Sequence, residues 1–596
     1  MSDLITDSNG DPMGLVTDRE EWLSSATPER NRMRMRKEVF GVFGDRTAFE
    51  RHRESDAFDA VLAGDRLTVG IRDPALGVPG RSDVHEGEHG LCVVWGEAFC
   101  PAGGESVAAW LADAYADRGA DALADLNGSY LVALEHGTDT LVATDPIRSW
   151  ECFYTDAHDA RVFGSDPTAV QLTVPSPKVR RESLLEYLHL GTVLGEKTLF
   201  ERTHRAPFDG YLTPDEAGEF RRFVYEQTEF DYVDELADRL RRAIERRSDY
   251  PGDTGLLLSA GYDSRVLLSQ LPAVDRCYTV GDHDDEEVQA ARRVAAQYDT
   301  DHTVLETDDR YLSLEPSKNR YNQTIKESLH VHHAGYTDDI DVDSVYHGLL
   351  YDTLFKGFFL ERDSVEVAGK RLPWERLADD PDPVESLLDT LAFSPPDSRD
   401  ISRLAEHVFT DVGLDDPEDF LRSSLASELE SCQDRASNPH DATDLLAIRN
   451  QPVLPFRTHL ADNFLESFVA VDSDLLDWHL RTPPEHRNGQ TFREAMDRID
   501  PAIDRYDPPD RPHDIDILNH VESFLRRRLP FLAPFDSAWP DRNEVYERYD
   551  VAVRLPFSPA PDVSVRHALR LHDALTQAAF HESWEERAAY PVHKEE

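Results

Sequence analysis

The chain has 596 residues, too many for one hydrophobic core, and this length favours roughly two to four domains. It carries 116 acidic against 63 basic residues, and the formal charge of −53 is spread along its whole length. Such a surface excludes nucleic acid and anionic membranes as partners, and is typical of proteins from salt-adapted (halophilic) organisms. The sequence has no long apolar run, no secretory leader and no CxxC pair among its five cysteines. We therefore expect a cytoplasmic protein with reduced thiols.

Residues 1–36 contain no apolar periodic segment longer than a turn or two, and we expect a mobile extension there. Between residues 37 and 175, short apolar runs such as GLCVVWG and SYLVALEHGTDTLVATD alternate with turn residues and predict strands. One stretch, GESVAAWLADAYADRGADALADL, predicts a helix among them. These patterns indicate an α+β domain at 37–175, followed by a linker at 176–230.

The pattern changes in the segment 231–510, where strands and helices alternate along the chain. The expected elements are a strand at 254–258, a helix at 264–271, a strand at 276–280, a helix at 285–298 and a strand at 302–305. This order predicts a parallel α/β unit with right-handed crossovers. Beyond residue 380 nearly every segment has a helical pattern, so we expect an α/β domain with a helical carboxyl-terminal part, and a helical extension at 511–596.

The stretch TGLLLSAGYDSRVLLSQL, residues 254–271, joins a strand to a helix through small residues. Ser259, Ala260 and Gly261 let backbone N–H groups approach an anion, and the positive end of the helix that begins near Ser264 faces the same place. A carboxylate at Asp263 would repel phosphates unless a divalent metal lay between them, which points to a nucleotide with Mg²⁺. The alternative is a simple turn in which Ser259 or Asp263 caps the helix.

Several segments resemble the asparagine synthase superfamily, in order, from residue 37 to about 510. LLLSAGYDS resembles the SGGxDS loop of its ATP-pyrophosphatase (PP-loop) domain, and HGLLYDTLFKGFF resembles its SGEGSDEVFGGY segment. VVWGEAF, DLNGSYLVAL and ATDPIRSWECFYT resemble strands of its glutaminase domain. The resemblance implies an Ntn-hydrolase-like, class II glutamine amidotransferase-like domain followed by an α/β domain of the PP-loop type.

In that family the second domain adenylates a carboxylate with ATP and Mg²⁺, and an amine then displaces AMP to leave an amide. The resemblance implies that the nucleotide is bound by Leu258, Ser259, Ala260, Gly261, Tyr262, Asp263, Ser264, Val280 and Gly348. Within this set, Leu258 and Val280 would line the adenine site. Asp263 and Asp352 would hold Mg²⁺.

The first domain departs from the family at its nucleophile. That nucleophile is a Cys at the start of the mature chain, with its free amine as the base. The aligned position here is Lys37, with 36 residues before it, and neither Met33 nor Met35 is followed by Cys. Ser2 lies in the wrong segment to replace it. We therefore expect no glutamine hydrolysis, and a structural or docking role for this domain.

The second domain departs from the family at its base and at its pyrophosphate-binding Lys. Leu349 and Thr353 occupy the two Glu positions of SGEGSDE, and no Lys occurs between Lys370 and Lys594. Candidate replacements are Arg505 or Arg511 for the positive charge, and Tyr351 or the cluster of His330, His332 and His333 for the base. Packing and loop solvation are the competing roles of the Tyr and His residues.

Two functions remain open from the sequence. The first is an AMP-forming ligase that amidates a small-molecule carboxylate with ammonia or a small amine, without glutamine. The second is a catalytically degenerate nucleotide-binding paralogue with a regulatory or scaffolding role. Glutamine-dependent asparagine synthesis is a third interpretation, against which the lost Cys and Glu count. The sequence is compatible with a homodimer and does not identify the acceptor.

Overall fold

The computed structural model describes residues 5–6 and most of 36–579. Within 36–579 the description omits residues 89, 104–105, 158–159, 312–318, 328–331, 368–369, 391–415, 451–453, 510, 512, 514–515, 529–534, 536–539, 541, 556–557 and 560–563. The expected extension 1–36, with Ser2, Met33 and Met35, therefore lies almost wholly outside the described residues, as does Lys594. Among the helices described, none is both long and apolar enough to cross a membrane.

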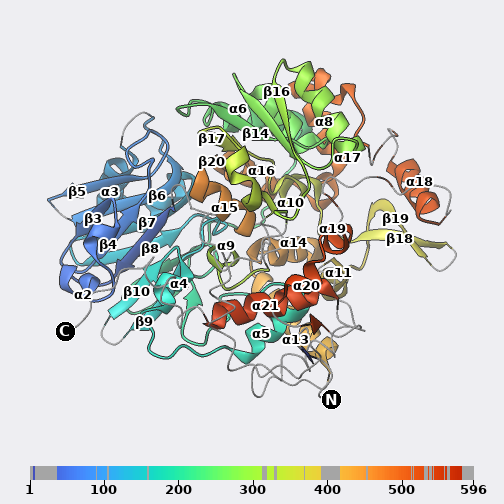
Figure 1. Ribbon diagram of the computed structural model, residues 1–596. Helices are drawn as coiled ribbons and strands as arrows, with labels where there is room; N and C mark the ends of the chain where they lie inside the picture. Colours follow the sequence, from blue (N-terminus) through green and yellow to red (C-terminus); the bar gives the residue numbers. More distant parts are fainter. Residues whose placement is uncertain are drawn as a thin grey trace.

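The amino-terminal unit contains two six-stranded antiparallel sheets, drawn in blue and cyan in Figure 1. The first has the order β11 (His204–Arg205), β9 (Phe153–Ala157), β10 (Ala160–Gly164), β2 (Glu38–Val42), β4 (Thr68–Arg72) and β3 (Ala60–Ala63). The second has the order β13 (Ala217–Glu219), β12 (Gly210–Leu212), β8 (Asp139–Thr144), β7 (Asn127–His136), β6 (Gly90–Phe99) and β5 (Asp83–Gly87).

Side chains that point alternately to the two faces of a strand explain how these sheets stack. On β6, Val93 and Trp95 point into the core between the two sheets, whereas Cys92 and Val94 pack under helix α3 (Val107–Arg118). The outer face of the first sheet is covered by α2 (Arg46–Glu50) and α4 (Pro167–Gln171). The result is a four-layer helix–sheet–sheet–helix unit, and the expected α+β class is confirmed. The segment 176–230, expected as a linker, supplies β11, β12 and β13 to the edges of these sheets.

The second unit is built on five parallel strands, in the order β16 (Asp301–Leu305), β15 (Arg276–Val280), β14 (Thr254–Leu257), β17 (Ser344–Tyr346) and β20 (Leu465–Ser467). Helices α7 (Tyr262–Gln270) and α8 (Glu286–Gln297) connect the first three strands along the chain, as the sequence predicts. Leu256 packs into the core on one face of the sheet and Leu257 into the core on the other. Both faces are therefore buried, which explains the continuous apolar runs of these strands.

Helices on both sides complete this unit. They are α5 (Arg181–Leu190), α6 (Tyr232–Glu245), α9 (Asn319–Asn322), α10 (Tyr351–Lys356), α11 (Pro383–Thr390), α13 (Pro417–Cys432), α14 (Pro439–Arg449), α15 (Leu454–Asn463), α16 (Ser473–Arg481), α17 (Gly489–Ile499), α18 (Asp516–Arg528), α19 (Arg542–Arg548), α20 (Val551–Arg554) and α21 (Val565–Ala579). A hairpin of β18 (Arg362–Val367) and β19 (Lys370–Leu377) lies at the periphery, near α18 (Figure 1). Strand β1 (Ile5–Thr6) pairs with β21 (Ser558–Pro559).

Buried ion pairs join the two units. Arg247, at the end of α6, is fully buried and contacts both Glu97 of β6 (2.8 Å) and Asp472 (2.6 Å). A second group links Arg320 of the parallel-sheet unit to Asp166 of the amino-terminal unit (2.8 Å) and to Asp462 of α15 (2.5 Å). Because these charges are desolvated, they are specific contacts that fix how the two units sit together.

Candidate functional site

Two loops meet at the carboxyl edge of the parallel sheet. Strands β14 and β17 are neighbours, with Thr254 opposite Ser344, so the chains that leave them emerge side by side. At this meeting point Gly348 lies against Asp263: a Cβ on Gly348 would lie 2.7 Å from the Cβ of Asp263. A side chain at this position would push the loops apart, which explains the need for glycine.

The loop after β14 is folded on itself by short hydrogen bonds. The backbone N–H of Ser259 donates to Oγ of Ser264 (3.1 Å), and that of Gly261 donates to Oγ of Ser259 (3.2 Å). The N–H of Ala260 donates to the buried carboxylate of Glu287 on α8 (2.5 Å). Gly261 is the N-cap of α7, and no side chain caps the helix. The alternative in which Ser259 or Asp263 serves as the cap is therefore wrong, and the first turn of α7 points its N–H groups at the loop.

Helix α10 brings a second carboxylate and a lysine to the same place. It begins after Leu350, whose φ of 67° lies in the left-handed region, at a cost of about 1–2 kcal/mol for a residue with a Cβ. Nζ of Lys356 lies 2.7 Å from Oδ1 of Asp263 and also pairs with Oδ1 of Asp352, one turn earlier on the helix. The structure thus brings Asp263 and Asp352 together, with an ammonium group between them.

Burial and neighbouring charges have opposing effects on the pKa values of Asp263 and Lys356. Burial raises the pKa of Asp263 to about 6; the ammonium of Lys356 opposes the rise, and the charge of Asp352 adds to it. Burial lowers the pKa of Lys356, because it disfavours the charged form. The negative charges of Asp263 and Asp352 outweigh this effect, so the pKa of the ammonium is raised. The side chains of Asp263 and Lys356 are 18% and 16% exposed, whereas that of Asp352 is 58% exposed. The group is therefore most open to solvent on the side of Asp352.

Of the two arginines proposed for the positive charge, one acts on this group. The charge of Arg511 helps to lower the pKa of Asp263 against the effect of burial. Arg505 is exposed, and its guanidinium lies 5.5 Å from the ring centre of its neighbour Tyr506. The assignment of Arg505 or Arg511 to the family's positive charge stays a prediction, and Lys356 is the cation that contacts the carboxylate of Asp263.

Tyr351 is not placed to act as a base. It is fully buried against Phe355 and Phe492, and its hydroxyl has no hydrogen-bond partner among the described residues. Burial raises the pKa of this phenol, so it keeps its proton at neutral pH. His330 lies outside the described residues. His332 and His333 begin the 3₁₀ segment His332–Asp339, and their side chains are not described.

The residues expected around the adenine lie at the ends of adjacent strands. Leu258 and Val280 are both buried, but they pack into different cores on the two faces of the sheet. Tyr262 turns away from the loop, and its hydroxyl donates to Asp504 (2.6 Å). The assignment of Leu258 and Val280 to an adenine site stays a prediction.

Sequence reasoning missed Lys356 and Glu287. Lys356 follows Asp352 by four residues, the spacing that places two side chains on one face of a helix, and it stands where the aligned motif SGEGSDEVFGGY has glycine. The four-residue spacing from Asp352 and the replacement of the motif's glycine by Lys are the two sequence features that could have pointed to Lys356. No sequence signal marks Glu287, because its contact with Ala260 depends on how α8 packs beside the loop.

Lys37, which the resemblance aligns with the family's nucleophile, lies at the contact between the two units. Its backbone N–H donates to Oδ1 of Asp462 (3.0 Å), and its carbonyl oxygen accepts from Arg320. Its side chain is buried, with Nζ 3.5 Å from Oδ1 of Asp73. The nitrogen of residue 37 is thus a hydrogen-bonded peptide group at the interface.

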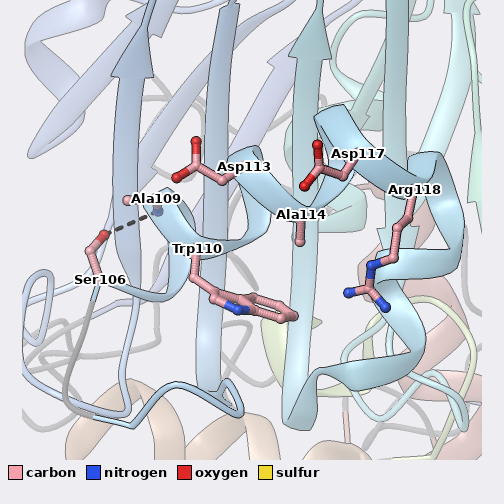
Figure 2. A pocket seen from close by; sticks show the side chains of 7 residues that line it. All are labelled: Ser106, Ala109, Trp110, Asp113, Ala114, Asp117 and Arg118. Carbon is pink, nitrogen blue, oxygen red and sulfur yellow. Dashed lines mark hydrogen bonds between the residues drawn. The ribbon is translucent and has the colours of Figure 1, made fainter.

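Among the described residues, two hollows lie outside the β14–α7 loop. One, of about 590 Å³, is a surface depression along α3, where the labelled side chains include Trp110, Asp113 and Arg118 (Figure 2). It lies on the outer layer of the amino-terminal unit, far from α10 (Figure 1). The other, between the two units near Leu350, is lined by Arg148 and Arg449 among others and has a volume of about 20 Å³. That volume is room for about one water.

The comparisons with known proteins bear mainly on the parallel-sheet unit. The sequence model of the asparagine synthase family matches residues 235–314, which hold β14, α7, β15, α8 and β16. No curated protein matches the chain. Among solved structures, glutamine phosphoribosylpyrophosphate amidotransferase from B. subtilis, complexed with ADP and GMP, is 11% identical, with a TM-score of 0.21. The match covers 45% of this chain and 65% of that one, so this chain spans less than two thirds of its length.

A structure described as the allosteric regulatory enzyme of purine biosynthesis is 12% identical, also with a TM-score of 0.21, over 54% of this chain and 75% of that one. Superpositions this weak add nothing to the fold described above. The family match, by contrast, falls on the strand–loop–helix segment that presents Asp263. Residues 235–314 of this chain are thus similar to the asparagine synthase family.

Proposed function

We propose that this protein is an ATP-dependent, AMP-forming ligase of the asparagine synthase type, which adenylates a small-molecule carboxylate for amidation by ammonia or a small amine. The observation that carries the proposal is the meeting of the β14–α7 loop with α10, where Asp263, Asp352 and Lys356 lie at one edge of the sheet. Open α/β sheets bind their ligands at such an edge.

In this proposal the chain's own groups receive the triphosphate of ATP. The uncapped first turn of α7 offers N–H groups and a partial positive charge, and the hydroxyls of Ser259 and Ser264 line the loop. An oxygen of the carboxylate substrate attacks the α-phosphorus, and the bond to pyrophosphate breaks. Lys356 and Arg511 offset the charge that develops on the leaving pyrophosphate. The amine then attacks the acyl carbon, AMP leaves, and the amine's proton passes to water.

The resemblance would add Mg²⁺ bound by Asp263 and Asp352. Two carboxylates suit this ion, which prefers oxygen ligands and usually takes one or two carboxylates together with phosphate oxygens. Here, however, one oxygen of each carboxylate contacts Nζ of Lys356, and the ion does not fit beside that ammonium. No step of the proposal passes through a metal.

We further propose that the amino-terminal unit does not supply ammonia from glutamine. A free α-amine at residue 37 is needed for that chemistry, and the nitrogen of Lys37 is a peptide group hydrogen-bonded to Asp462. The acidic surface supports a role in a salt-rich cytoplasm, with small molecules rather than nucleic acid or membranes as partners. Assembly as a homodimer is compatible with this role.

A second candidate, the nucleotide-binding paralogue without catalysis, is favoured by one observation. The positions that carry Glu in the family motif hold Leu349 and the buried Thr353, and the nearby Tyr351 is buried as a neutral phenol. None of these three can accept a proton from an attacking amine. Under this candidate the site holds a nucleotide, and its occupancy regulates or organises a partner.

Release of pyrophosphate separates the two candidates. The protein would be incubated in molar KCl with ATP, ammonium and a panel of small carboxylates, and nucleotide binding would be measured in parallel. Release with any carboxylate, lost in Asp263→Asn but retained in the exposed-site control Arg505→Ala, supports the ligase. Binding of ATP without release for every carboxylate supports the paralogue. The absence of both refutes the nucleotide site.

A further inference from the structure

The position between Asp263 and Asp352 is taken by a side chain. Nζ of Lys356 lies 2.7 Å from Asp263 and is paired with Asp352 as well. These are distances at which a cation contacts carboxylate oxygens directly. The carboxylates come from two helices, α7 and α10, so one ammonium group joins the two loops that form the site.

Neighbouring groups hold Lys356 in this position. It follows Asp352 by one helical turn, so the pair forms within α10 without long-range folding. Its Nζ also lies 5.3 Å from the ring centre of Phe492 on α17, within range of a cation–π contact. With only 16% of its side chain exposed, the ammonium has little water around it to compete with the carboxylates.

We infer that the ammonium of Lys356 stands in for a divalent cation, and that the site receives a phosphate-bearing ligand without metal. Lys356 supplies a positive charge in contact with both carboxylates. It is fixed to the chain, so this charge does not have to be recruited from solution. The nature of the ligand, a nucleoside triphosphate, rests on the proposed function above.

Manganese binding tests the inference without any nucleotide. Mn²⁺ would be titrated into the wild-type protein and into Lys356→Met, in molar KCl, with bound ion followed by electron paramagnetic resonance. Met keeps the aliphatic length of the side chain and removes the charge. The wild type should bind no Mn²⁺ at this site, whereas Lys356→Met should gain one ion that is lost again in the double variant with Asp263→Asn. The exposed control, Lys178→Met, should behave as the wild type does.

The second test measures the affinity for ATP by calorimetry, once in EDTA and once in excess Mg²⁺. The wild type should bind with the same affinity in both, within about twofold, and Lys356→Met should lose about tenfold or more in EDTA and recover in Mg²⁺. A wild-type protein that binds Mn²⁺ through Asp263, or that binds ATP only with Mg²⁺, overturns the inference, and so does a folded Lys356→Met that gains no ion.

The two proposals fail in different ways. If ATP binds under no condition, the proposed function is refuted, while the manganese titration still decides the role of Lys356. If Lys356→Met does not fold, the wild-type protein and Asp263→Asn carry the test, because a manganese site in the wild type that disappears in Asp263→Asn contradicts the inference by itself.

Discussion

Lys37 and Asp462 are separated by 425 positions in the chain, yet the backbone N–H of one donates a 3.0 Å hydrogen bond to a carboxylate oxygen of the other. Asp462 also pairs with Arg320, which in turn contacts the carbonyl oxygen of Lys37. The residue that the resemblance aligns with the family's nucleophile is thus part of the contact between the two units.

Restoring the thiol alone should not restore glutamine hydrolysis. In Lys37→Cys the nitrogen of residue 37 remains a peptide group, so the thiol lacks the amine that would take its proton. We expect glutamate release from glutamine at background level in both the wild type and this variant, by enzyme-coupled assay in molar KCl. Glutamate release above background in the wild type would contradict the assignment of this unit as non-hydrolytic.

ATP binding should require Gly348, the glycine at which the two loops meet. In Gly348→Ala the new Cβ would lie 2.7 Å from Cβ of Asp263, a distance that forces the loops apart. We expect ATP affinity to fall about tenfold, since a displacement of the loop misplaces several donors at once. The matched control is Gly489→Ala at the start of α17, where a Cβ meets no atom within 4 Å. Equal affinities in the two variants would show that the ligand does not use this edge.

Removal of the buried phenol should leave chemistry unchanged. The hydroxyl of Tyr351 is buried and unpartnered among the described residues, so Tyr351→Phe loses no hydrogen bond that the structure shows. We expect stability equal to the wild type or higher by about 1 kcal/mol, because burying an unsatisfied hydroxyl is costly. Pyrophosphate release, where it occurs, should stay within about twofold of the wild type. A loss of release at unchanged stability would instead assign a catalytic role to the hydroxyl.

The contact between the units should depend strongly on Arg247. This guanidinium is fully buried and bonded to Glu97 and Asp472, so Arg247→Met removes from both carboxylates their buried shared cation, and leaves Asp472 paired with the half-buried Arg246. Breaking a buried pair costs about 3–5 kcal/mol. The control, Arg498→Met, removes a pair with Asp234 in which both side chains are more than half exposed, and should change stability by less than about 1 kcal/mol. Thermal unfolding in molar KCl measures both, and equal shifts would refute the assigned importance of Arg247.

Glu466 gives a prediction for acid pH. Burial opposes its ionisation, but Arg457 (3.0 Å) and His347 (2.9 Å) outweigh burial and lower its pKa from 4.5 to about 2. A lowered pKa stabilises the fold above the unfolded value of 4.5, and the contribution is lost as pH falls toward 2. Glu466→Gln should therefore cost about 3 kcal/mol near neutral pH, and its deficit against the wild type should shrink below pH 4.5. Thermal unfolding across this range measures the deficit, with the exposed Glu430→Gln as control; a constant deficit would contradict the assignment.

The sequence predicts structure that depends on residues close together in the chain better than contacts between residues far apart in the chain. The strands and helices of 254–305 follow from local patterns, since apolar runs and turn residues lie close together, and they match within about two residues. Strands β12 and β13 have three residues each, too few to show alternation, and so the sequence predicts a linker there. The burial of Tyr351 and the contact of Lys356 with Asp263 depend on how α10 packs against α7 and α17, which no local pattern reveals.

The pairs around Arg247 also bear on how the protein tolerates concentrated salt. Dissolved ions weaken attraction between charges at the surface, where the screening length at molar ionic strength is about 3 Å, but they do not enter a sealed interior. Glu97, Arg247 and Asp472 lie in such an interior. Their attraction is thus insulated from the surrounding electrolyte, and the joint between the two halves of the molecule should hold at ionic strengths that abolish exposed ion pairs.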